Sequence, residues 1–73
     1  MPEIVLYSRD GCHLCDEARS ALARHGFEFA VVDVDADPEL QKRYNDCVPV
    51  VVIDGQERFR GRVDELLLGR LLP

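Results

Sequence analysis

The sequence predicts an α/β domain whose strands and helices follow one another in the order βαβαββα. Three observations predict this order. The apolar run Ile4–Tyr7 and the alternating run Phe27–Val34 flank a segment of helical periodicity, as in a right-handed βαβ unit with parallel strands. The β-branched run Val50–Ile53 ends at Asp54-Gly55, which is a strong signal for a β-hairpin. A helical apolar stripe then closes the chain.

Turn-forming residues at positions 8–11 separate the first strand from the first helix. The helix is predicted from Cys12 onward, with Gly26 as its C-cap. Acidic residues in its early turns and basic residues in its last turn complement the helix dipole. Its apolar residues recur at helical spacing and predict the face that packs on the sheet: Leu14, Ala18, Ala21 and Leu22.

The second half of the chain contains two more helices and the hairpin. Asp37 is the predicted N-cap of a short helix that has Pro38 at its first position and ends near Asn45. Beyond the hairpin turn, Glu57–Arg60 is predicted to return as an antiparallel edge strand. The last helix has an apolar stripe formed by Val63, Leu66, Leu67 and Leu71.

Length and charge limit the classes of function. A chain of 73 residues can build one compact domain, which we expect to span residues 1–73. Its net charge of -5 argues against nucleic acid and anionic membranes as partners, because both require a basic surface. No segment has the length of a signal peptide's apolar region or of a membrane span, so we expect a cytoplasmic protein.

Two of the three cysteines, Cys12 and Cys15, lie at C-x-x-C spacing where the first helix begins. In a reducing compartment this spacing indicates redox or metal chemistry. Unpaired N–H groups and the helix dipole stabilise a thiolate at a helix N-terminus, so we expect Cys12 to be the nucleophile. Cys15 lies almost one turn further on and is expected to be more buried and less acidic. This pair predicts attack of Cys12 on an external disulfide, followed by resolution of the mixed disulfide by Cys15.

Three segments of the chain, Tyr7–Cys15, Val48–Val50 and Gly61–Glu65, resemble the landmark segments of glutaredoxins in order and separation. The match is closest to the small glutaredoxin-like proteins of bacteria. The resemblance implies a thioredoxin-like α/β fold, with a four-stranded mixed sheet flanked by helices and a cis peptide bond before Pro49, beside the cysteine pair. It also implies a thiol-disulfide oxidoreductase that reduces disulfides of proteins or mixed disulfides of glutathione.

The same resemblance implies a set of substrate-binding residues. Arg9 stands where glutaredoxins place a basic residue that meets a glutathione carboxylate. The backbone of Val48, next to Pro49, would hydrogen-bond the peptide part of a bound thiol, and Asp64 would lie near its amino end. Glutathione is thus a candidate co-substrate, with no tightly bound cofactor expected. A reductase system would recycle the protein, which we expect to be a monomer.

Two motifs depart from the family pattern, and two residues have open interpretations. The site reads Cys-His-Leu-Cys instead of the usual Cys-Pro-Tyr-Cys, and Arg62 replaces the second glycine of a Gly-Gly turn. His13 either tunes the Cys12 thiolate or is an exposed polar residue of the first turn. Without the resemblance, Arg9 would be interpreted as a solvated loop residue.

Other classes of function remain open at this point. A metal or iron-sulfur module would use Cys12, Cys15 and Cys47 with a further ligand such as His13 or a thiol from a second chain. Purified protein that is colourless and free of zinc would set this aside. A non-catalytic adaptor that keeps only the fold is a third hypothesis, against which the intact cysteine pair is the main argument.

Overall fold

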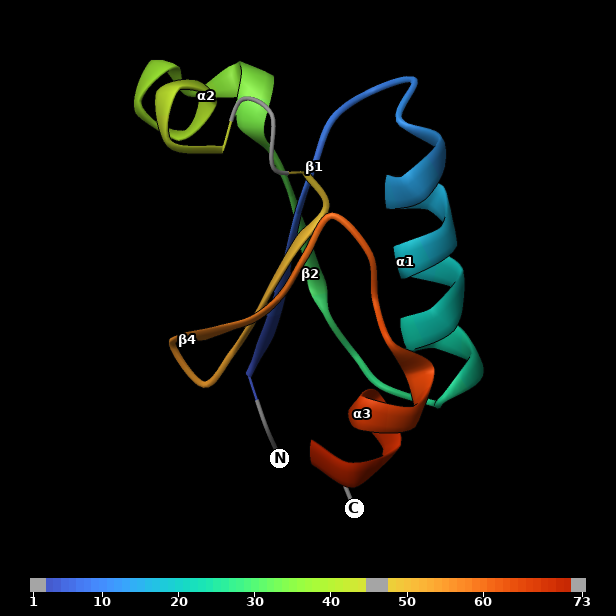
Figure 1. Cartoon of the computed structure of the whole chain (residues 1–73). Coiled ribbons are helices and arrows are strands. Elements are labelled where there is room, and N and C mark those ends of the chain that lie inside the picture. The colour runs from blue at the N-terminus through green and yellow to red at the C-terminus, as the bar shows by residue number, and fades with distance from the viewer. Residues whose placement is uncertain (1–2, 45–47, 72–73) are drawn as a thin grey trace.

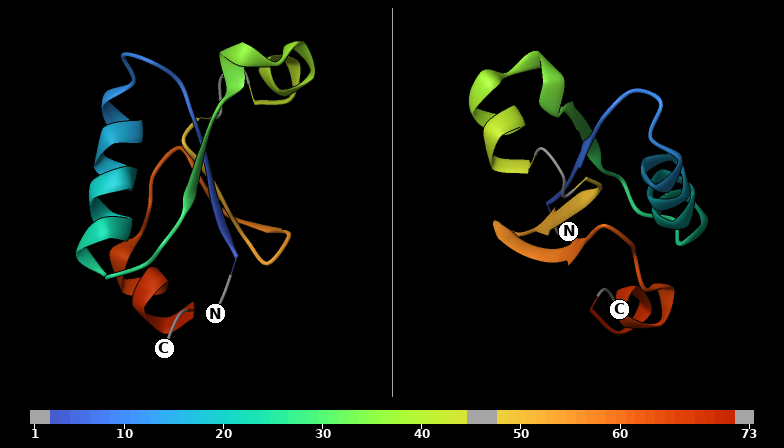
Figure 2. Two further views of the ribbon diagram at one scale, coloured as in Figure 1. Left: turned by 180° about the vertical axis from the view of Figure 1, so that it is seen from behind. Right: turned by 45° about the horizontal axis from the view of Figure 1, so that its top comes forward.

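Four strands form one mixed sheet in the order β2-β1-β3-β4, and helices lie on both of its faces (Figures 1 and 2). The computed structural model describes residues 3–44 and 48–71. Its elements are β1 Ile4–Ser8, α1 His13–Arg24, β2 Ala30–Asp33, the 3₁₀ helix η1 Val34–Ala36, α2 Pro38–Tyr44, β3 Val50–Ile53, β4 Gln56–Arg60 and α3 Glu65–Leu71. None of the described helices has the length and apolar character needed to cross a membrane.

The strand pairing confirms the predicted topology. β1 is parallel to β2 and antiparallel to β3, which in turn is antiparallel to β4. Asp54 and Gly55 connect β3 to β4 with φ angles of 51° and 81°. Positive φ at both central residues is what a tight hairpin turn of type I′ requires, which explains the Asp-Gly pair.

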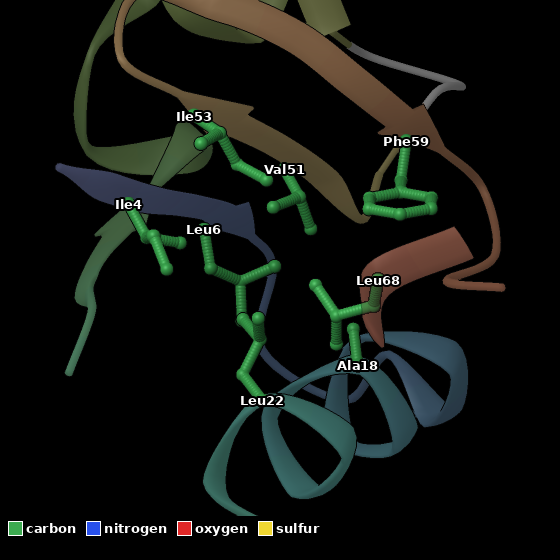
Figure 3. Packing of buried hydrophobic residues seen from close by; sticks show 8 residues of the cluster. All are labelled: Ile4, Leu6, Ala18, Leu22, Val51, Ile53, Phe59 and Leu68. Atoms are coloured by element: carbon green, nitrogen blue, oxygen red, sulfur yellow. The ribbon is translucent and has the colours of Figure 1, made fainter. Parts of the chain in front are cut away.

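Alternate residues of each strand face opposite sides of the sheet and supply two cores. On the face covered by α1 and α3, one cluster contains Ile4, Leu6, Ala18, Leu22, Val51, Ile53, Phe59 and Leu68, whose side chains point toward one another in Figure 3. On the face covered by α2, a second and smaller cluster contains Val34, Tyr44 and Val50. Both faces of the sheet therefore carry a core, and the larger one lies under α1 and α3.

The first helix differs from the prediction at both ends. Cys12 is its N-cap and lies outside the helix, and His25 is its C-cap, followed by Gly26 with a φ of 78°. The predicted buried residue Leu14 is instead 37% exposed. Leu14 lines an open groove, so no neighbouring element covers it. Cys15 is buried on the face that packs against the sheet.

The second strand is shorter than predicted, because β2 begins at Ala30 instead of Phe27. Phe27 is half-buried against the first core without belonging to the sheet. At the other end, Val34 opens η1 and is fully buried. The Asp33 carboxylate accepts a hydrogen bond from the Asp35 N–H at 2.9 Å, which turns the chain out of the strand. The second helix begins at Pro38 as predicted, while Asn45, its predicted end, lies outside the described residues.

The predicted apolar stripe of the last helix is correct only in part. Val63 packs against the first core as predicted, but Leu66 and Leu67 do not belong to the buried face. Leu68 is fully buried, whereas Leu66 is 80% exposed and Leu67 is 47% exposed. At about 100° per residue, Leu66 and Leu67 point away from the direction in which Leu68 enters the core. The side chain of Leu71 lies outside the described part of the chain.

Polar contacts hold the start of α3. Asp64 caps the helix by accepting hydrogen bonds from the N–H groups of Leu66 and Leu67. Glu65 binds Arg24 at 3.0 Å and His25 at 3.3 Å, which ties α3 to the end of α1. The Arg24 guanidinium in this contact holds the pKa of the Glu65 carboxyl below its ordinary value.

We expect Leu68→Ala to lower the free energy of unfolding by about 3 kcal/mol, because it leaves a cavity where α3 meets the sheet. Leu66→Ala, on the same helix, is the matched control and should change it by less than about 0.5 kcal/mol. Urea unfolding followed by far-UV circular dichroism measures both. Equal effects of the two substitutions would contradict the packing described for α3.

Candidate active site

A short loop carries the chain from the end of β1 to the first turn of α1. Within it, Gly11 has a φ of 74°, and the N–H of Cys12 donates a hydrogen bond to the carbonyl oxygen of Arg9 at 3.3 Å. A positive φ is inexpensive for glycine, so this residue suits the tight turn. The turn places Cys12 directly before the first helical residue, His13.

Cys12 occupies the N-cap position of α1. Its sulfur accepts a hydrogen bond from the N–H of Cys15 at an N···S distance of 3.2 Å, and its carbonyl accepts one from the N–H of Asp16. A backbone donor and the positive end of the helix dipole thus face this sulfur, and both favour negative charge on it. Cys12 is also partly exposed, so an external disulfide can reach it.

Cys15 lies behind Cys12 and is only 3% exposed. Burial raises the pKa of its thiol to about 12, with further contributions from its hydrogen bond to Cys12 and from the negative charges of Cys12 and Asp16. A hydrogen bond to the Arg9 backbone acts in the opposite direction. Both cysteines are free thiols. The pair therefore consists of a partly exposed cysteine at the N-terminus of α1 and a buried cysteine whose thiol keeps its proton.

The Val48-Pro49 segment lies at the same end of the sheet as the cysteine loop (Figure 1). The peptide bond between the two residues is cis, which confirms what the family resemblance implied. Val50 pairs with Tyr7, so Pro49 begins β3 beside the residue from which the loop departs. The carbonyl of Pro49 accepts a hydrogen bond from the N–H of Gly61 at 2.8 Å, which fixes the segment against the end of β4.

Arg9 makes a contact that sequence reasoning missed. Its Nε and Nη2 atoms donate hydrogen bonds to the two carboxylate oxygens of Asp35 at 2.9 and 3.0 Å. Asp35 is far from Arg9 in sequence, but β1 and β2 are parallel and Ser8 pairs with Asp33. The residues that follow these two partners leave the sheet at the same end. The predicted parallel βαβ unit implied that the residues after these two strands lie close together, but it did not identify Asp35 as the partner of Arg9.

His13 and Asp64 have their own partners in the structure. His13 is exposed, and its Nε2 lies 3.7 Å from a carboxylate oxygen of Glu17. The Asp64 carboxylate caps α3, whose next residue Glu65 contacts the end of α1 that is remote from Cys12. The roles that the resemblance implied for Arg9, His13, Val48, Pro49 and Asp64 in substrate binding stay predictions.

A groove of about 620 Å³ runs along α1 between its first and last turns. Residues of α1 line one wall and Arg62, Val63 and Glu65 line the other. Neither cysteine of the pair lines it, so the groove passes beside the thiols and does not enclose them. Arg62, the residue that replaces a family glycine, is exposed on its wall.

Residues 3–44 and 48–71 contain no cluster of side chains that supports the metal hypothesis. Within those ranges no group of three or more histidine, cysteine, aspartate or glutamate side chains is placed to hold a metal ion. Cys47, the third cysteine considered for such a site, lies outside the described residues.

Comparison with known families gives one match over nearly the whole chain. The model of the family described as Glutaredoxin-like domain (DUF836) matches residues 3–73. An uncharacterized protein of Mycobacterium tuberculosis is 34% identical in an alignment that covers 88% of this chain and 75% of the relative.

Solved structures of similar proteins share the same fold. A protein from Nitrosomonas europaea, solved by NMR, has a TM-score of 0.85 and 32% identity over 99% of this chain and 92% of its own. NrdH-redoxin from Escherichia coli has a TM-score of 0.77 and 27% identity over 97% of this chain and 96% of its own. The latter is described as a glutaredoxin-like protein with a thioredoxin-like activity profile. These likenesses confirm the predicted thioredoxin-like α/β fold.

Proposed function

The chain belongs to the Glutaredoxin-like domain family (DUF836), and from this premise we propose that it is a thiol-disulfide oxidoreductase whose redox pair is Cys12 and Cys15. The family and the fold support a redox function in general. One observation carries the specific proposal. Cys12 is partly exposed, its sulfur caps α1 by accepting the N–H of Cys15, and Cys15 itself is buried.

The proposed reaction has two steps. Cys12 loses its proton to water, and its sulfur attacks one sulfur of a disulfide to form a mixed disulfide. The other half of the disulfide leaves as a thiolate that takes up a proton. Cys15 then loses its proton to solvent, and its sulfur attacks the Cys12 sulfur. This closes the Cys12–Cys15 disulfide and releases the second half as a thiol. Two electrons and two protons pass from the protein to the substrate.

Each group near the pair has a part in this reaction. The N–H of Cys15 and the α1 dipole stabilise the Cys12 thiolate both before attack and when it leaves during recycling. Burial keeps Cys15 protonated until the mixed disulfide forms, which limits premature reaction of the second thiol. The Val48-Pro49 segment, held at the same end of the sheet, would offer backbone groups to an extended substrate.

The remaining parts of the proposal concern partners and location. The substrates would be disulfides of proteins or mixed disulfides of glutathione, and a dithiol reductase or glutathione would supply the electrons that reopen the Cys12–Cys15 disulfide. We propose a cytoplasmic monomer without a tightly bound cofactor. Its negative net charge gives no basis for binding nucleic acid or an anionic membrane.

The direct test equilibrates the protein in buffers of reduced and oxidised glutathione and counts free thiols by alkylation and mass spectrometry. We expect reversible loss of two thiols, mapped to Cys12 and Cys15. In Cys15→Ser, the second step is blocked, so a glutathione adduct should accumulate on Cys12. Metal analysis of the same samples checks the alternative metal site.

The Cys47→Ser variant is the matched control, because it leaves the proposed pair intact and should show the same two-thiol change. Oxidation that maps to Cys47 instead of the pair would refute the proposal. Cysteines that stay reduced across the whole range of buffers would refute it as well.

A further inference from the structure

Arg9 is the cationic side chain of the loop that carries Cys12. Its carbonyl accepts the N–H of Cys12, so the two residues are fixed relative to each other. An arginine at this place would attract a negatively charged disulfide to the thiolate, because opposite charges raise the rate of encounter. Whether it does so depends on what binds its guanidinium.

Asp35 binds that guanidinium through both of its carboxylate oxygens, which is the strongest geometry for such a pair. Asp35 is itself held in place. Its backbone N–H donates to Asp33 at 2.9 Å, and Gln41 of α2 donates to its Oδ1 at 3.2 Å. The side chains of Arg9 and Asp35 are 29% and 37% exposed, so the pair is half-shielded from solvent. The positive charge of Arg9 is therefore balanced by a prepositioned carboxylate.

The other charges near the pair are mostly negative. Asp16 lies in the first turn of α1 and raises the pKa of the Cys15 thiol by charge repulsion. Asp10 is exposed in the loop itself, and Glu17 lies beside His13. With the charge of Arg9 balanced by Asp35, these three carboxylates outnumber Arg62 on the groove wall. They bias the approach to Cys12 toward negative potential.

We propose that Asp35 is a specificity-determining residue, which selects protein disulfides flanked by neutral or basic side chains over small anionic disulfides. This inference rests on the proposed function and names its substrate class. Asp35 touches neither cysteine, so it acts through Arg9 and through the potential at the site.

The test compares the second-order oxidation rates of the reduced protein by oxidised glutathione, which is doubly negative, and by cystamine, which is doubly positive. Neutral 2-hydroxyethyl disulfide serves as the reference reagent. In Asp35→Asn, which keeps the shape of the side chain and an oxygen acceptor, Arg9 regains its net charge. We expect the ratio of the glutathione rate to the cystamine rate to rise about tenfold at low salt, with each rate moving about threefold in opposite directions. The rise should shrink in high salt.

Three variants make the result specific. Glu39→Gln removes the same charge from α2 without touching Arg9 and should leave the ratio within about twofold of wild type. Arg9→Gln should lower the ratio, because Asp35 is then unbalanced. The double variant Arg9→Gln/Asp35→Asn replaces an ion pair of zero net charge by two uncharged side chains. It should return the ratio close to that of wild type.

The outcomes separate the two proposals. A ratio that Asp35→Asn leaves unchanged, or changes no more than Glu39→Gln does, overturns the role of Asp35 while the redox function stands. If wild-type protein reacts with none of the three reagents, the proposed function fails and this inference fails with it. A salt-dependent rise that is reversed in the double variant supports the inference.

Discussion

Replacing Cys12 with serine is expected to abolish disulfide reduction and to leave the chain as stable as before. The two expectations come from the two tasks of this residue. As nucleophile, Cys12 needs an ionised sulfur, and a serine hydroxyl without an adjacent base does not replace it. We therefore expect the rate with 2-hydroxyethyl disulfide to fall by at least about a thousandfold.

As a helix cap, Cys12 is replaceable by serine. Its sulfur accepts the N–H of Cys15 at the N-terminus of α1, and serine is among the residues preferred at this position. The Cys12→Ser variant should keep its free energy of unfolding within about 1 kcal/mol of wild type, or gain slightly. Loss of activity in this variant would thus report on chemistry and not on folding.

Two measurements on the same sample check this prediction. Acid quenching, alkylation and mass spectrometry give the rate at which thiols are lost, and urea unfolding gives the stability. Cys12→Ala is the matched control for the cap, because it removes both the nucleophile and the acceptor and should cost about 1 kcal/mol. If Cys12→Ser is oxidised at the wild-type rate, the nucleophile is another cysteine and this prediction is wrong.

Much of the fold was predictable from local patterns in the sequence. The β-branched run Val50–Ile53 and the Asp54-Gly55 turn mark β3 and the hairpin without any tertiary information. The place of Cys12 at the start of α1 follows in the same way from a strand, a glycine turn and a helical period. These features depend on residues close in sequence, so a single sequence carries them.

The features that were missed depend on contacts between residues distant in sequence, or on which of several neighbouring apolar residues faces the core. Leu66, Leu67 and Leu68 are all apolar, so periodicity could not tell which of them faces the core. The packing of α3 against α1 and the sheet decides that Leu68 does, and the contacts of Glu65 with the end of α1 agree with this orientation. Likewise, the Arg9–Asp35 pair exists because two parallel strands end together, and no local pattern joins these residues.

The resolving step is expected to accelerate steeply with pH, by nearly tenfold per unit between about pH 6 and pH 9. Only the thiolate of Cys15 attacks the mixed disulfide. With a pKa raised to about 12, on the order of one Cys15 thiol in 10⁵ is ionised at pH 7 in the reduced protein. The rate should therefore rise with pH as this fraction rises, and no plateau should occur at neutral pH.

The physical causes of this pKa also predict how the intermediate behaves. Burial is the largest cause and persists when Cys12 is in a mixed disulfide, whereas the charge of the Cys12 thiolate is then gone. The pKa of Cys15 should thus fall in the intermediate but stay above its ordinary value of 9.0. This makes Cys15 more reactive at the moment when the mixed disulfide needs it.

Quenched-flow mixing of reduced protein with excess 2-hydroxyethyl disulfide, with mass analysis of the products, measures this step at each pH. Asp16→Asn removes a charge that raises the pKa of Cys15 and should speed resolution by about twofold at pH 7. Glu17→Gln, its neighbour on α1, makes the same charge change without contributing to that pKa and is the matched control. A resolution rate that is flat between pH 6 and pH 9 would show that Cys15 is already ionised, and that burial does not hold its proton.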